Sequence, residues 1–459
     1  MNFKIIKTIV FVSIIGLLII KPIVVKAQYD LGFYNMRLVP QTNLLNPAFI
    51  PDYKFHFGAP AMSSTYAGFG TSGPKYSDIF MVTPGDSLGI NPEGILNNVK
   101  SSNNINSRST QQWLNGGMKW KNFYFSASIS DIVDVNMLYS DKLAQLAIKG
   151  NAPFIGETIN LKPLALKAMH YREFAFGAAW DINDKLNIGM KAKLLLGKAA
   201  VNTEKMDFEL TTTEDYYYLD IKSNFLVNSS LPSFKVDSSD VTISEYMLYG
   251  SNIGVGLDFG ATYKLNDLWN FSASVLDLGY IQYDRYLRTY SSDTEFTYKG
   301  IDVMQFEGME DKEREARIDE IKDSLIDLFD IQQSANRFIV PLTAKIYLGA
   351  DYQFSDKEMI SALVRIEIFK GVIRPSFTAS YYRQLNDHFG VSASYSMINR
   401  SYLNLGLGLV ANFNPFQFYI ATDNIIGVIT PDNVRYGNIH VGINFVFKGN
   451  DRRHPMIEL

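Results

Sequence analysis

The stretch that decides the fold reads FGVSASYSM, from Phe389 to Met397. Its odd-numbered residues are apolar and its even-numbered residues are Gly or Ser, which is the period of a β-strand. The same alternation returns at residues 402–409 and from Ile439 to Phe447. Each segment has roughly the 9–11 residues that a tilted strand needs to cross a bilayer. Because large residues share one face and small ones the other, the pattern predicts barrel strands with lipid outside and a polar lumen inside.

The composition agrees with a membrane barrel. The chain has 459 residues, of which 47% are hydrophobic, yet its mean hydropathy is only -0.04 because the apolar residues are scattered. After the N-terminus no apolar run reaches about 18 residues, which excludes a helical membrane bundle. The absence of cysteine excludes disulfides, thiol catalysis and a lipoprotein anchor. The formal net charge of -4 gives no support for nucleic-acid binding.

Residues 1–27 have the pattern of an export signal. Lys4 and Lys7 precede an apolar core from Thr8 to Ile20, and small residues flank Lys26 at the expected cleavage point. We expect cleavage before Gln28, whereas an uncleaved membrane anchor is the alternative. A signal followed by a barrel predicts the outer membrane of a Gram-negative bacterium.

Short turns rich in Asn, Asp and Ser separate the alternating segments and predict tight hairpins. They are Lys121-Asn122, Asn183-Asp184, Asn266-Asp267, Ser355-Asp356, Asn386-Asp387 and Asn414-Pro415. Aromatic residues gather beside these turns, as at a membrane interface, so we assign the turns to the periplasmic rim. Counting strands between them predicts an all-β, antiparallel up-and-down barrel over residues 53–447, with about fourteen strands and a range of roughly twelve to sixteen. Residues 448–459 then form a polar periplasmic tail.

The long connections are expected outside the cell, and some of them carry helices. We predict a helix from Asp141 to Ile148, with Ser140 as its N-cap and Gly150 after its end. A second helix, from Met309 to Asp330, has an apolar stripe. This stripe could cover neighbouring loops or bind a partner, and covering is the more ordinary use. An aromatic hairpin is expected around residues 215–220.

Residues 28–52 lie between the signal and the barrel. Pro47 forbids a ladder hydrogen bond, so this segment is a turn or a plug and not a strand. The motifs YNMR at 34–37, LNPAF at 45–49 and ATDN at 421–424 resemble those of an uncharacterised family of exported barrels of the FadL fatty-acid transporter and PorV secretion-protein type. The resemblance implies that residues 28–52 form a hatch inside the barrel, with Asn46-Pro47-Ala48 in it. A periplasmic arm without a gating role is the alternative.

Strand parity points a set of charged residues into the lumen. The cations are Lys191, Lys193, Lys345 and Arg365, and the acidic residues are Glu173, Asp258, Asp351 and Glu367. We expect pairing between the two groups, because ions removed from bulk water keep partners. The cations are also candidate contacts for an anionic head group, and the acidic residues are their candidate partners.

No constellation for catalysis stands out. The five histidines lack metal-ligand spacing, and no Gly-x-Ser-x-Gly elbow or phosphate-binding loop is present, so we expect neither an enzyme nor a cofactor. Two functions stay open. A FadL-like barrel would bind or pass hydrophobic or amphipathic small molecules and have an apolar pocket beside the hatch. A PorV-like barrel would bind exported proteins or a secretion channel and have a filled lumen. Outer-membrane lipid is an expected partner in both cases.

Overall fold

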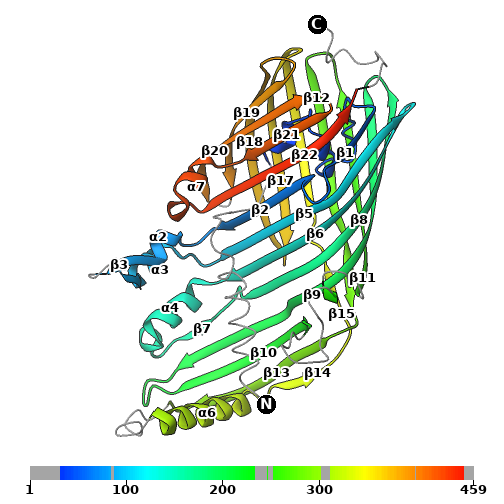
Figure 1. Ribbon diagram of the computed structural model, residues 1–459. Helices are drawn as coiled ribbons and strands as arrows, with labels where there is room; N and C mark the ends of the chain where they lie inside the picture. Colours follow the sequence, from blue (N-terminus) through cyan, green and yellow to red (C-terminus); the bar gives the residue numbers. More distant parts are fainter. Residues whose placement is uncertain are drawn as a thin grey trace.

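The computed structural model describes residues 31–83, 87–232, 245–246, 252–300, 311–398 and 400–448. These residues form a closed antiparallel barrel of fourteen strands, as predicted (Figure 1). The first strand is split into β1 (Phe55–Gly58) and β2 (Ser64–Thr71), where the sequence places Gly58 and Pro60. Both parts pair with the last strand, β22 (Tyr436–Phe447), and this pairing closes the barrel.

The other wall strands each pair with the next along the chain. They are β5 (Asn103–Trp120), β6 (Phe123–Tyr139), β8 (Ala165–Asn183), β9 (Leu186–Thr212), β11 (Asn252–Lys264), β12 (Trp269–Tyr283), β15 (Phe338–Pro341) continued by β16 (Lys345–Ser355), β17 (Glu358–Phe369), β18 (Val372–Gln384), β19 (Phe389–Ile398), β20 (Ser401–Phe413) and β21 (Phe416–Thr422). Every strand that the alternation predicted is present in the predicted order.

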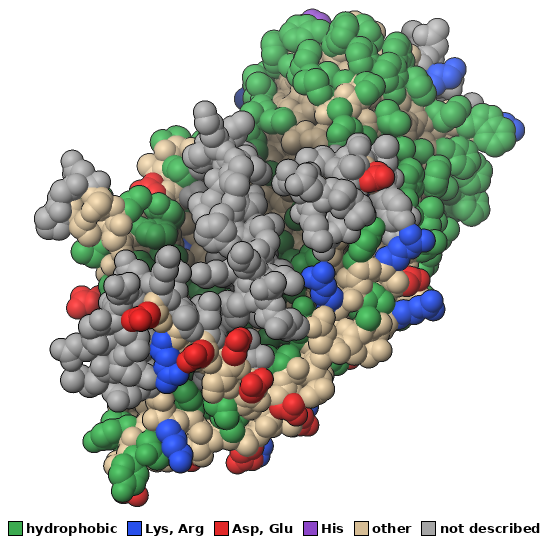
Figure 2. Space-filling view, turned by 60° about the horizontal axis from the view of Figure 1, so that its bottom comes forward, with side chains coloured by type: hydrophobic (Ala, Val, Ile, Leu, Met, Phe, Trp, Pro, Cys, Tyr) green, Lys and Arg blue, Asp and Glu red, His purple; other side chains and the backbone are tan. Residues whose placement is uncertain are grey.

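The six predicted turns all lie at one rim of the barrel. Aromatic side chains surround this rim. Phe123 stacks on Trp180 with ring centroids 5.8 Å apart, and Trp269 meets Tyr352 edge-on at 4.9 Å. In barrels of this type the short turns face the periplasm, so the opposite end, with the long connections, is called the outer end. Figure 2 shows apolar side chains over the barrel wall and charged ones over the parts beyond its outer end.

The wall has the two faces that the alternation predicted. On β20, for example, Leu405, Leu407 and Leu409 are exposed on the outside, while Asn404 and Val410 are buried. A bilayer covers the outward residues, and the lumen holds the inward ones. None of the described helices is both long enough and apolar enough to cross a membrane.

Beyond the outer end, β9 runs on and carries a sheet of its own. The outer sheet consists of residues 198–212 of β9 with β7 (Thr158–Asn160), β10 (Leu219–Ser230), β13 (Leu287–Tyr298) and β14 (Gln332–Ser334). The β9–β10 hairpin holds the predicted aromatic turn. The sequence interpretation ended β9 at Gly197, because outside the membrane no bilayer enforces a strict alternation.

The helices lie at the outer end. They are α2 (Tyr76–Ile79), α3 (Pro92–Asn98), α4 (Asp141–Lys149), α6 (Asp311–Leu328) and α7 (Ile425–Ile429), with short 3-10 turns η3 (Ala152–Phe154) and η5 (Pro431–Asn433). The prediction for α4 is confirmed, because Ser140 Oγ accepts a hydrogen bond from the Leu143 amide at 3.3 Å and Gly150 follows with φ of 67°. α6 also forms, although Met309 and Glu310 lie outside the described residues.

The apolar stripe of α6 is only partly covered. Ile318 and Leu328 are 38% and 37% exposed, whereas Phe329, just after the helix, packs edge-on against Phe296 with centroids 4.9 Å apart. Covering of neighbouring elements is thus seen at the end of the stripe, at Phe329, while Ile318 and Leu328 stay partly exposed. The spacing of apolar residues along a helix does not say how much of the stripe a neighbour reaches.

Candidate functional site: the plug and the charged lumen

Residues 31–52, called the plug, lie inside the barrel (Figure 1). They include two short 3-10 helices, η1 (Phe33–Asn35) and η2 (Pro40–Leu44), and most of their side chains are buried. Such a compact irregular segment leaves many backbone groups without internal partners, so the wall must supply them. Lumen side chains from strands all around the barrel do so.

The plug begins at the outer end of β21. The two oxygens of Asp423 accept hydrogen bonds from the amides of Leu31 at 3.1 Å and Gly32 at 2.7 Å. The same carboxylate accepts from Tyr436 Oη and Asn438 Nδ2 of β22, at 2.9 and 2.8 Å. A buried carboxylate with four donors is well satisfied and holds the plug to two strands at once.

The Asn46-Pro47-Ala48 turn lies against the opposite wall. Asn46 Oδ1 accepts from the Ala48 amide at 2.9 Å, which closes the turn, and Asn46 Nδ2 donates to the carbonyl of Ala273 on β12 at 3.2 Å. Two wall glycines make room for it. A Cβ on Gly189 would lie 2.3 Å from the Pro47 carbonyl, and one on Gly260 would lie 2.0 Å from Asn46 Oδ1. The sequence analysis missed both glycines, because small lumen residues are common in any barrel.

Two further contacts fix the middle of the plug. Arg37 forms an ion pair with Asp351 at 3.0 Å and lies over the ring of Phe49, 3.3 Å from its centroid. Gln41 and Asn444 exchange two amide hydrogen bonds, of 2.6 and 2.9 Å. The lumen position of Asp351 alone suggested an ion pair with one of the wall cations. In the structure Asp351 pairs with Arg37 of the plug instead.

Charged side chains from the wall gather in the lumen beside the plug, and we call them the lumen charge cluster. Its members are Arg108, Lys167, Lys191, Lys193, Lys345, Arg365 and Arg374 with Asp134, Glu173, Asp258, Asp277 and Glu367. Cations outnumber carboxylates in this set. Burial of so many charges is tolerable only because nearly all of them are paired, yet the set as a whole keeps an excess of positive charge.

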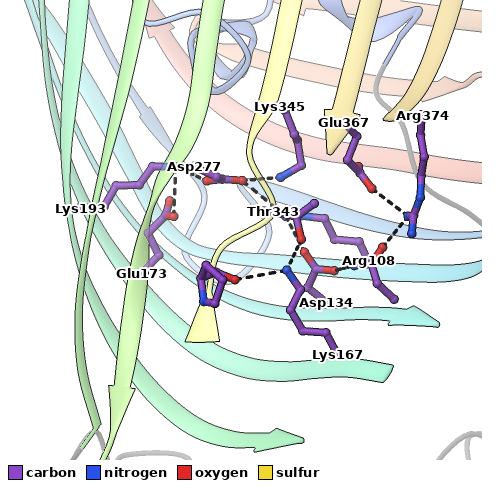
Figure 3. A network of polar contacts seen from close by, with 12 residues as sticks. Arg108, Asp134, Lys167, Glu173, Lys193, Asp277, Thr343, Lys345, Glu367 and Arg374 are labelled. Atoms are coloured by element: carbon purple, nitrogen blue, oxygen red, sulfur yellow. Dashed lines mark hydrogen bonds and ion pairs between the residues drawn. The ribbon is translucent and has the colours of Figure 1, made fainter. Parts of the chain in front are cut away.

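The carboxylate of Asp277 connects three cations of the cluster (Figure 3). Its carboxylate lies 2.7 Å from Lys193 Nζ and 3.7 Å from Arg108, and it also pairs with Lys345. Lys193 reaches Asp258 as well, at 2.8 Å. Lys193 also lies 3.4 Å from Glu173, and Arg108 lies 3.3 Å from Asp134, so these two cations each have more than one carboxylate partner.

Sequence parity did not find Asp277 or Arg108, and β-bulges explain both omissions. The β11–β12 register shifts beside Asp258, and Asp277 has φ of 61°, so Leu276 and Asp277 both point inward. A second bulge, after Gln112 on β5, changes the parity of Arg108 relative to the rest of its strand. A bulge shifts the register by one residue and moves the following side chains to the other face. No sequence pattern in these stretches indicates where the bulge occurs.

A second part of the cluster lies toward the outer end. Glu367 pairs with Arg365 at 2.5 Å and with Arg374 at 3.1 Å. Lys167 donates to Thr343 Oγ1 and to the carbonyl of Pro341. Residues far apart in the sequence, from β8, β15, β17 and β18, are thus brought together at one level of the barrel.

Lys191 and Lys167 are the two cations of the cluster that form no ion pair with a carboxylate of the described residues, and Lys191 is the one that contacts the plug. Its Nζ donates to the plug carbonyl of Asn43 at 2.7 Å, and it forms no ion pair with any carboxylate of the described residues. It lines a cavity of about 110 Å³ between plug and wall, to which Leu44 and Leu45 of the plug contribute apolar surface. The other lining residues include Arg108, Lys193, Lys345 and Arg365. Ile132, Leu276 and Tyr347 of the wall add further apolar surface. The cavity is therefore amphipathic, with apolar and charged side chains side by side, and not the purely apolar pocket that a FadL-like barrel predicted.

The structure thus brings most of the predicted lumen residues together. Lys191, Lys193, Lys345, Arg365, Glu173 and Asp258 all line the cavity, and Glu367 contacts Arg365 from beside it. Asp351 lies apart, with Arg37. Among the residues that the structure describes, no group of His, Asp and Glu is arranged to hold a metal ion.

Comparison with known proteins gives a family. The family model described as "Family of unknown function (DUF5723)" matches residues 47–423, most of the chain. The chain belongs to this family. The match starts at Pro47 of the plug turn and ends at Asp423, so it covers most of the wall residues that hold the plug but not residues 31–46 of the plug itself. A search of curated proteins finds no match for this DUF5723 member.

Several solved structures are similar to it at low scores. The Pseudomonas putida toluene transporter TodX is 11% identical over 88% of this chain and 91% of its own, with a TM-score of 0.39. A Pseudomonas aeruginosa FadL homologue is 11% identical over 89% and 94%, with a TM-score of 0.42. The Ralstonia pickettii toluene transporter TbuX is 9% identical over 89% and 94%, also at 0.42. Similarities this low do not identify a ligand for the DUF5723 chain.

Proposed function

We propose that this protein is a plugged outer-membrane barrel that binds and passes small amphipathic molecules with an anionic head group. The observation that carries the proposal is the position of Lys191. It faces the cavity, it lacks a carboxylate partner among the described residues, and its one hydrogen bond goes to the plug. An anionic head group is a stronger acceptor than the Asn43 carbonyl, so binding would weaken the attachment of the plug.

The size and lining of the cavity limit what enters it. About 110 Å³ is well below the roughly 300 Å³ of a typical small-ligand pocket. A carboxylate with the first carbons of its chain fits, but a whole amphipathic molecule does not. The apolar remainder would have to occupy space that the plug now fills, so binding and displacement of the plug are coupled in this proposal.

The test compares a fatty carboxylate with the alcohol of the same chain length. Binding to the purified barrel is measured by calorimetry for the wild type, for Lys191→Met and for Lys264→Met, a control in an exposed periplasmic turn. Loss of a hydrogen bond to a charged group costs about 1.5–3 kcal/mol, so Lys191→Met should bind the carboxylate about tenfold to a hundredfold more weakly. Equal binding of carboxylate and alcohol, or no effect of Lys191→Met, would refute the proposal.

A second candidate is a barrel that binds exported proteins. Two observations favour it: the plug and the lumen charge cluster fill the lumen, and the outer sheet extends beyond the membrane with a polar, charged face. Glu209, Lys222 and Glu295 lie on that face, on three adjacent strands. Purification from native membranes in mild detergent distinguishes the two. A protein partner in equal amounts, with no bound lipid, would replace the transport proposal.

A further inference from the structure

The first outer connection, residues 72–102, contains a small two-stranded hairpin. It consists of β3 (Phe80–Thr83) and β4 (Ser87–Ile90), and it projects sideways from the outer ends of β2 and β5 (Figure 1). Phe80 is opposite Ile90, and Val82 is opposite Leu88. Directly opposite residues share a face, so one face of the hairpin consists of these four apolar side chains.

Phe80 packs against Tyr76 with ring centroids 4.7 Å apart, but the other three side chains of that face are largely uncovered by the rest of the described chain. Val82, Leu88 and Ile90 are 69%, 66% and 65% exposed. The two strands contain no charged residue. An isolated hairpin of two short strands is at best marginally stable in water, so an apolar face of this kind indicates a second surface that buries it.

The base of the hairpin is fixed to the barrel. Arg435, just before β22, donates to the Gly73 carbonyl and to Asn98 Oδ1, both at 2.9 Å. Lys75 Nζ donates to Asn433 Oδ1 of η5 at 2.7 Å. These bonds come from both ends of residues 72–102. The hairpin is therefore held in one direction and does not swing freely.

Next to it along the rim lies further exposed apolar surface. α7, directly before η5, exposes Val428 and Ile429, the latter by 73%, and packs against β20 and β22. At the outer end of β20, Leu403 is exposed on the same parity as Leu405 and Leu407 of the lipid-facing wall. α7 contacts η5, η5 contacts α2, and α2 leads directly into β3. Leu403, α7 and the hairpin therefore follow one another along the outer rim, beside the lipid-facing wall.

We propose that the β3–β4 hairpin and α7 bind the outer leaflet of the membrane, with the apolar face of the hairpin in the boundary between head groups and acyl chains. The position of the hairpin on the outer rim, beside the lipid-facing wall and next to the exposed apolar residues of α7, favours lipid over a protein partner. So does the lack of charge on the strands, because the borders of protein interfaces are polar. A short amphipathic element at this boundary buries apolar area without crossing the bilayer. This inference is independent of the proposed transport.

The absence of cysteine in the chain makes a direct test possible. Single variants Val82→Cys and Leu88→Cys are labelled with bimane. Leu407→Cys on the lipid-facing wall is the lipid reference, and Asp215→Cys in the β9–β10 turn is the water reference. Each protein is placed in vesicles of phosphatidylcholine and phosphatidylglycerol, in which part of the lipid carries a nitroxide either on the head group or in mid-chain. Aqueous iodide is the second quencher.

We expect nitroxide lipid to quench the label at Cys positions 82 and 88 to about the extent seen at position 407. The head-group nitroxide should be the more effective one, and iodide should quench several-fold less than at position 215. Quenching by iodide as strong as at position 215, without an effect of nitroxide lipid, would show the face in water and overturn the proposal. Protection from both quenchers would show that protein covers the face, and this result overturns it as well.

Discussion

Removal of the Asp423 carboxylate should release the plug. In the closed barrel this group accepts the amides of Leu31 and Gly32, and it is only 2% exposed. A hydrogen bond to a charged group contributes about 1.5–3 kcal/mol. Asp423→Ala therefore weakens plug docking by about 3–6 kcal/mol. Since each 1.4 kcal/mol is tenfold, the open population rises by at least about a hundredfold. Asp423→Asn keeps one neutral acceptor and should have roughly half the effect on the free energy.

A buried cysteine in the plug reports this opening. Val39 is fully buried, so Val39→Cys reacts with a water-soluble maleimide only when the plug leaves the wall. If opening and closing are faster than labelling, the labelling rate follows the open population. We expect that rate to rise at least about a hundredfold in Asp423→Ala and about tenfold in Asp423→Asn.

The control is Asp432→Ala, which removes an exposed carboxylate from the neighbouring η5. Its labelling rate should equal that of the parent. Each variant is first shown to be a folded barrel by its heat-modifiable migration on a gel. Unchanged labelling in a folded Asp423→Ala barrel would mean that other contacts hold the plug, and the reasoning from these two hydrogen bonds would be wrong.

Further predictions concern the plug turn, the N-terminus and the orientation. Gly260→Ala places a methyl group against Asn46 Oδ1, so it should cost about 1–3 kcal/mol of plug docking, measured with the same cysteine reporter; an unchanged rate contradicts the contact. Because residues 1–27 have the pattern of an export signal, intact-mass measurement should find the mature chain beginning at Gln28; a mass that includes residues 1–27 would contradict cleavage. A maleimide that cannot cross membranes should label Asp215→Cys on intact cells and Asp387→Cys only after permeabilisation. The reverse result would show that the barrel has the opposite orientation in the membrane.

The barrel itself could be predicted from the sequence because two solvents act on every strand. Lipid selects large apolar residues and the lumen selects small or polar ones, so a period of two repeats along segments such as Phe389–Met397. The turns and the rim aromatics follow from the same boundary between lipid and water. Outside the membrane this selection ends. The sequence interpretation accordingly stopped β9 at Gly197, whereas the strand continues to Thr212.

The plug and the lumen were predicted less completely. The resemblance to FadL-type barrels implied a hatch and named its Asn46-Pro47-Ala48 turn, but Gly189 and Gly260, against which the turn lies, looked like ordinary lumen residues. Parity correctly pointed Lys191 inward but did not find Asp277, which lies at a bulge. A bulge is a local slip of one residue, and its cause lies in packing with neighbouring strands.

The sequence by itself thus determined the architecture, the membrane-facing surface and several of the charges that enter the lumen, because each depends on local alternation. Only the tertiary structure decided which charges pair, where the plug attaches and that the cavity beside it has both apolar and charged walls. The physical reason is distance along the chain. Gly32 and Asp423, which meet at 2.7 Å, are 391 residues apart, and closure of the barrel alone brings them together.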